Sequence, residues 1–127
     1  MVGGPNGRRP RGSHGEHDQF ARRLGTVLAE TIGGTLSVDP GRIARKGRGD
    51  ARTAFARHVA IYLACTRFGV TFTEAGRIFG RDRTTAAYAC RRIEEARDGV
   101  RTDRLVEQLD RAVSARIGHA AGRERAA

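Results

Sequence analysis

The chain has 127 residues, a formal net charge of +10 and only 6% aromatic residues. This length fits one small domain with a modest aliphatic core. The longest apolar run, 59–65, is too short to cross a bilayer, and residues 1–16 lack the apolar centre of a secretory signal. Cys65 and Cys90 do not have the spacing of a zinc or disulfide framework. We therefore expect a cytoplasmic protein with reduced cysteines, no metal and no other cofactor.

The positive charge is concentrated in two segments. The first basic segment, 41–57, has a net charge of +5, and the second basic segment, 77–92, has +4. The stretches 17–40 and 93–117 each have −1. Charge confined in this way is typical of a surface that binds a polyanion. The alternative is a general preference for arginine, of which there are 23 against one lysine; it explains the residue type but not the placement.

Apolar residues recur with helical spacing, and no stretch alternates as a strand does. This pattern predicts an all-α domain of about five helices over 17–117. A Gly- and Arg-rich arm, 1–16, and a short tail, 118–127, have little to bury and are expected to be disordered.

The first helix is expected over 18–32 and ends at a Gly-Gly pair. Asp39 followed by Pro40 predicts a short helical turn as far as Ile43. A loop rich in glycine and arginine follows, at 45–49.

Capping residues mark the remaining helices. Asp50 is placed to cap one helix, and Thr71 with Glu74 forms a capping box before the next. Thr102 is placed to cap the last helix. The expected ranges are 51–68, 72–79, 82–96 and 102–117.

The helices at 72–79 and 82–96 together have the outline of a helix-turn-helix. Gly76 is small where the two helices would cross, and Gly80 lies in the turn. A plain helix–helix corner also favours glycine there, but the charge distribution favours DNA binding. The outward positions of the second helix are polar, as a recognition helix requires: Arg83, Thr84, Tyr88, Arg91 and Arg92.

Three stretches resemble the C-terminal DNA-binding domain of DnaA, the bacterial replication initiator. They are A-R-H-V-A-I-Y-L at 56–63, E-A-G-R-I-F-G-R-D-R-T-T at 74–85 and A-C-R-R-I-E at 89–94. The family patterns are close to A-R-Q-x-A-M-Y-L, E-I-G-x-x-F-G-G-R-D-H-T-T and H-A-C-R-K-I-E. The resemblance covers about 18–117, and its R-D-x-T-T and A-C-R-x-I blocks are specific. It implies a helix-turn-helix domain of the Trp-repressor and DnaA type that reads a short duplex box.

The resemblance also implies roles for individual residues. In the family, the D-H-T-T run reads bases in the major groove, an Arg-Gln pair touches phosphate, and an arginine of the basic loop enters the minor groove. The base-reading positions here are Asp82, Arg83, Thr84 and Thr85. The expected phosphate contacts are Arg57, His58, Arg81, Tyr88 and Arg91. The nearest candidate for the minor groove is Arg48.

Three departures from the family pattern bear on which box is read. The family's Gly-Gly turn is shortened to Gly80, which could change the angle of the recognition helix. Arg83 stands in place of the family's histidine; it could pair bidentately with guanine or simply reach a phosphate. Simple alignment of the minor-groove arginine falls on Gly49, with Arg48 beside it.

The sequence has no G-x-x-x-x-G-K-[ST] loop, so we expect neither ATP binding nor enzyme activity. The expected partner is double-stranded DNA, without a membrane, so we expect the cytoplasmic protein to be nucleoid-associated. The favoured function is sequence-specific binding in replication initiation or its regulation by box occupancy. The alternatives are a transcriptional regulator with an unrelated operator and a nucleoid-type packaging protein that binds by charge alone. A protein-interaction module is disfavoured, because no exposed apolar stripe is evident.

Overall fold

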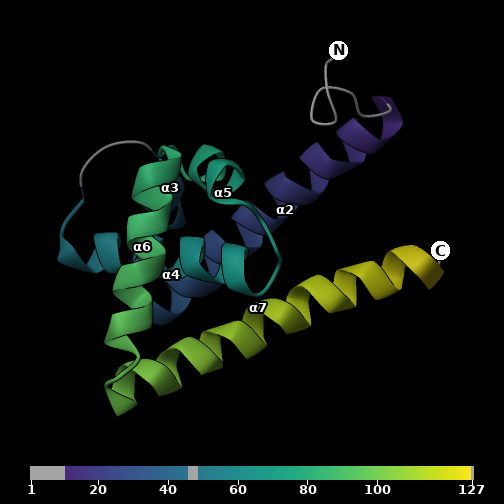
Figure 1. Ribbon diagram of the computed structural model, residues 1–127. Helices are drawn as coiled ribbons and strands as arrows, with labels where there is room; N and C mark the ends of the chain where they lie inside the picture. Colours follow the sequence, from purple (N-terminus) through teal and green to yellow (C-terminus); the bar gives the residue numbers. More distant parts are fainter. Residues whose placement is uncertain (1–10, 46–48, 127) are drawn as a thin grey trace.

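The computed structural model describes the backbone of residues 11–45 and 49–126 and the side chains of 18–45 and 49–118. Over the described backbone it contains six helices and no strand, which confirms the all-α fold. The helices, shown in Figure 1, are α2 (Arg11–Leu36), α3 (Pro40–Ala44), α4 (Ala51–Thr66), α5 (Phe72–Ile78), α6 (Arg83–Ala96) and α7 (Val100–Ala126). No helix in these residues is long and apolar enough to span a membrane.

Helix α4 is the centre of the fold. It packs against α2, α3, α5 and α6, and the run from Val59 to Ala64 is buried on all sides. Asp50 caps this helix by accepting a hydrogen bond from the Thr53 amide at 2.8 Å. The other large, fully buried side chains come from every remaining helix or its end: Leu24, Leu28, Ile32, Ile43, Phe79, Ile93, Val106, Leu109 and Val113.

Helix α2 is longer than the sequence pattern predicts. It continues past the Gly-Gly pair to Leu36 and ends where Ser37 adopts a φ of 59°, with the Val38 amide donating to the Gly33 carbonyl at 2.9 Å. Gly33 is needed for this return of the chain, because a Cβ there would meet the Val38 carbonyl oxygen and Pro40. The glycine therefore makes room for the following segment instead of ending the helix.

The first helix begins at Arg11, so residues 11–16 of the expected arm belong to α2, whereas 1–10 lie outside the described residues. Helix α7 likewise continues past Ile117 to Ala126. Both extensions follow from helix cooperativity, because lengthening a helix that packing already holds is much easier than starting one. Figure 1 shows these outer ends of α2 and α7 leaving the bundle on the same side.

The expectation that Thr102 caps the last helix is wrong. Helix α7 starts at Val100, and the Asp103 amide donates to the Gly99 carbonyl at 2.9 Å. Arg97 fixes this start: its Nε lies 2.7 Å from Asp103 Oδ1, and one of its terminal nitrogens donates to the Tyr62 hydroxyl at 3.1 Å. The position of α7 thus depends on a contact between the ends of α4, α6 and α7, which local sequence does not reveal.

Candidate nucleic-acid interface

Helices α5 and α6 form a helix-turn-helix whose turn is defined at both ends. The capping box starts α5: Glu74 donates its amide to Thr71 Oγ1 at 3.0 Å and accepts from the Thr71 amide at 3.1 Å. Gly80, with a φ of 68°, ends α5 in the left-handed conformation. The Arg81 amide then donates to the Gly76 carbonyl at 2.6 Å, which is the hydrogen bond of a Schellman motif.

Gly76 allows the turn to lie directly on α5. A Cβ at this position would meet the carbonyl oxygens of Arg81 and Asp82, which are backbone atoms that cannot rotate away. The single Gly80 is sufficient to reverse the chain, so the shortened turn forms a complete helix-turn-helix. This close approach fixes where α6 begins.

Asp82 caps α6. Its Oδ1 accepts a hydrogen bond from the Thr85 amide at 2.7 Å, and this bond holds the pKa of the carboxyl below its usual value. Arg83 and Thr84 follow on the first turn with exposed side chains, whereas Thr85 is half-buried. Three of the four expected base-reading residues, Asp82, Arg83 and Thr84, are therefore exposed, and Asp82 also has a structural role as the cap.

The two faces of α6 differ sharply. Ala86, Ala89 and Ile93 are buried against α4, and the small alanines let the two helices approach closely. The opposite face is exposed, with Tyr88 46% accessible. Arg91 and Arg92 are exposed on the same helix.

His58 joins this face to α4. Its ring meets that of Tyr88 edge to face, with 6.0 Å between centroids and 84° between planes. Burial, and then the positive charges of Arg57, Arg92 and Arg81, lower the pKa of His58. His58 thus lies close to three other expected phosphate-contact residues, Arg57, Arg81 and Tyr88. The structure adds Arg92, which lies one helical turn beyond Tyr88.

Arg57 corrects the sequence prediction. Only 6% of this residue is exposed, and its guanidinium donates to the carbonyls of Ile43 at 3.0 Å and Arg42 at 2.8 Å. These carbonyls belong to the last turn of α3, where a helix has no internal donors left for them. Arg57 therefore holds α3 against α4 instead of standing free for a phosphate, and burial lowers the pKa of its guanidinium.

The other arginines expected to contact DNA differ in their exposure. Arg81 is half-buried and donates to the Gly80 carbonyl at 3.0 Å, so it also supports the turn. Arg91 is exposed near the middle of α6. Arg48 lies outside the described residues, so its expected place in the minor groove stays a prediction.

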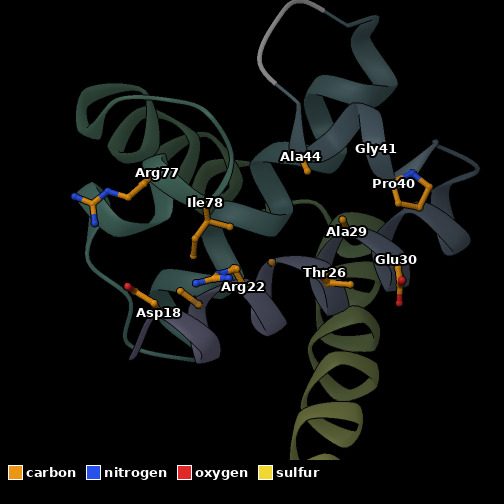
Figure 2. Close-up of a pocket in the computed structure, with 12 residues that line it drawn as sticks. Asp18, Arg22, Thr26, Ala29, Glu30, Pro40, Gly41, Ala44, Arg77 and Ile78 are labelled. Carbon is orange, nitrogen blue, oxygen red and sulfur yellow. The ribbon is translucent and has the colours of Figure 1, made fainter. Parts of the chain in front are cut away.

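A separate cavity of about 580 Å³ lies between α2, α3 and α5. Figure 2 shows its lining, with Ile78 of α5 pointing toward α2 beside Arg22. None of the expected DNA-contact residues lines it. No group of three side chains suited to a metal ion is present among the described residues.

Comparison with known proteins agrees with this geometry. The family described as bacterial dnaA protein helix-turn-helix matches residues 26–93. The matched range runs from α2 to α6 and includes the whole helix-turn-helix. No curated protein and no solved structure matches the chain.

Proposed function

Because this chain belongs to the bacterial DnaA helix-turn-helix family, a DNA-binding family, we propose that it binds double-stranded DNA at specific sequences through α6. The observation that carries the proposal is the first turn of α6. It is fixed by the Schellman turn and the Asp82 cap, and it presents Arg83 and Thr84 to solvent next to a cluster of positive charge. A recognition helix uses its N-terminal residues in this way to reach base edges.

We assign the roles by exposure. Arg83 and Thr84 read bases, and Thr85 contributes from the flank of the helix. Asp82 orients the first turn through its cap, and its carboxylate accepts from a base edge. Arg81, Tyr88, Arg91, Arg92 and His58 contact phosphates, and Arg48 enters the minor groove.

Selection of bound duplexes from a random pool tests this function. A defined box should emerge, and the protein should bind it more tightly than a scrambled duplex at moderate salt. Equal affinity for both would support the packaging alternative, which relies on charge alone.

The salt dependence measures the phosphate contacts. With Arg57 directed inward, three of the residues assigned to phosphates, Arg81, Arg91 and Arg92, are arginines that can neutralise them, so log K should fall with log salt at a slope of roughly −2.7. A slope shallower than about −2 would contradict the proposed face.

Substitution of Arg83 distinguishes a contact with guanine from a contact with phosphate. If it pairs with guanine, Arg83→Ala should cost about 1–3 kcal/mol on the selected box and relax selection at one base pair. If it binds phosphate, affinity should fall evenly on all duplexes and the salt slope should shrink by about one. Arg83→His, which restores the family residue, should move the selected box at that position only in the first case.

We propose that the physiological role is control of replication initiation by occupancy of such boxes, without enzyme activity. The family supports this role, because its domain serves a replication initiator. A regulator of promoters with an unrelated operator is the alternative. Mapping the bound sites on the chromosome decides between them: enrichment at the origin supports the first, and enrichment only at promoters supports the second.

A further inference from the structure

Cys65 and Cys90 come together between α4 and α6, although 24 residues separate them in the chain. Both are free thiols, both are half-buried, and both line one cavity of about 740 Å³ that opens to solvent. The sequence does not predict this pair, because only the packing of α6 on α4 brings the two positions together.

The two thiols are not equivalent. Each thiol shifts the pKa of the other. The interaction with Cys65 lowers the pKa of Cys90, whereas the interaction with Cys90 and burial raise the pKa of Cys65. Glu94 acts against the thiolate at Cys90, and Glu74 acts against one at Cys65, but neither contribution exceeds that of the interaction between the two thiols.

The same cavity also borders the recognition helix. Arg83 and Arg91 line it together with the thiols, and Cys90 lies seven residues after Arg83, two turns along the same flank of α6. A change at Cys90 therefore acts on the helix that carries the proposed base contacts.

We propose that Cys65 and Cys90 form a reversible disulfide between α4 and α6 when the protein meets a hydroperoxide. In the first step the Cys90 thiolate attacks the peroxide, its O–O bond breaks, and Cys90 sulfenic acid and hydroxide form. In the second step the Cys65 sulfur attacks the Cys90 sulfur, and the Cys65 proton leaves with the sulfenic oxygen as water. Two thiols are oxidised, one peroxide is reduced, and a dithiol such as dithiothreitol reverses the change.

The disulfide brings the two helices closer. The two sulfur atoms of a disulfide lie about 2 Å apart, which is closer than the sulfur atoms of two separate thiols can approach. The bond therefore draws the middle of α6 toward α4 and shifts its first turn. We infer that the oxidised protein binds its box less tightly, an inference that rests on the proposed function.

The chemistry is tested first on the full chain treated with hydrogen peroxide. Intact mass should fall by two hydrogens, and dimedone, which traps sulfenic acids, should add nothing. Cys65→Ser keeps a hydrogen-bond donor but cannot form the disulfide, so Cys90 should accumulate a dimedone adduct. Cys65→Ala removes the donor and should react more slowly, and Cys90→Ser should react more slowly than Cys65→Ser. Retention of both thiols in the folded wild type, or faster oxidation of Cys65 than of Cys90, would overturn the proposal.

The effect of the disulfide on DNA binding is measured with the selected duplex. The oxidised wild type should bind at least about fivefold more weakly than the reduced protein, equivalent to the loss of one base contact. Dithiothreitol should restore the affinity, and peroxide should leave the affinity of Cys90→Ser unchanged. A disulfide that forms without weakening binding would refute the regulatory inference alone. If the reduced protein does not prefer the selected duplex, the proposed function fails while the test of disulfide formation still stands.

Discussion

The first basic segment, 41–57, and the second, 77–92, carry similar charge and both have exposed arginines, but the first also contains a buried one. In the first segment Arg57 is buried and holds the last carbonyls of α3. In the second segment Arg83, Arg91 and Arg92 are exposed on α6. A count of charges therefore locates the proposed DNA-binding surface, but it does not distinguish exposed arginines from a buried one that stabilises the fold.

Arg57→Ala gives the largest expected effect. The change leaves the Ile43 and Arg42 carbonyls without their donors, so the free energy of unfolding should fall by roughly 2–4 kcal/mol. Urea unfolding measures it. Arg57→Lys keeps the charge but cannot span both carbonyls, and it should lie between wild type and Arg57→Ala. An unchanged urea midpoint together with weaker binding to every duplex would instead show that Arg57 serves as a phosphate contact.

Gly76→Ala tests whether the turn before α6 is as close as the structure has it. The added Cβ meets backbone carbonyls, so unfolding should become easier by about 1–3 kcal/mol. Gly34→Ala is the matched control, because that glycine has nothing within 4 Å and lies inside α2. The control should stabilise the protein by about 0.5–1 kcal/mol through helix propensity. Equal effects at both glycines would contradict the packed turn.

The free energy of unfolding should depend on pH through His58, which follows the first basic segment and contacts Tyr88 in the second. Its pKa in the folded protein is below the ordinary 6.5, so below that value the unfolded chain binds more protons than the folded one. The stabilisation is therefore complete above 6.5 and is lost as the pH falls through the lower folded value. Urea midpoints between about pH 7.5 and 5 should decline, and His58→Gln should flatten the decline.

The helix caps titrate in a separate window. The pKa values of Asp50 and Asp82 are held below 3.8 by their hydrogen bonds to backbone amides. Their stabilisation is present above 3.8 and is lost only as the pH falls below it, so it does not contribute to the decline assigned to His58. A decline that persists in His58→Gln would contradict the assignment.

Arg92→Ala should have the smallest effect on stability and is the outward counterpart of Arg57→Ala. Its side chain is exposed, so the free energy of unfolding should change by less than about 0.5 kcal/mol. The salt slope of DNA binding should shrink by about one. Isothermal titration at several salt concentrations, with urea unfolding in parallel, measures both quantities. A slope equal to that of the wild type would remove Arg92 from the interface.

Much of the fold is local and could be predicted. Asp39 and Asp50 each cap the helix that follows, and Thr71 with Glu74 closes the capping box, because these bonds join residues two or three positions apart. Asp82 caps α6 by a bond of the same kind, although the family resemblance implies only base reading for it. The inward positions Ala86, Ala89 and Ile93 also follow from helical spacing.

What could not be predicted depends on contacts between distant segments. Arg57 reaches carbonyls fourteen and fifteen residues away, and Arg97 reaches Tyr62 across 35 residues. Arg57 matches the family's phosphate-binding Arg-Gln pair and stands in a basic segment, so both the resemblance and its charge suggested a phosphate contact. The helix ends at Arg11 and Ala126 were missed because glycines and polar residues at those ends weaken the apolar pattern without stopping the helix.

The buried guanidinium of Arg57 also links folding to ligand binding. In the described part of the chain it bonds to carbonyls and to no carboxylate, and burial and then the neighbouring charge of Arg81 lower its pKa. Folding therefore brings the positive charges of Arg57 and Arg81 close together. A polyanion bound beside these two guanidinium groups would relieve their repulsion in the folded state only, so DNA bound there should raise the melting temperature of the protein as the DNA concentration increases.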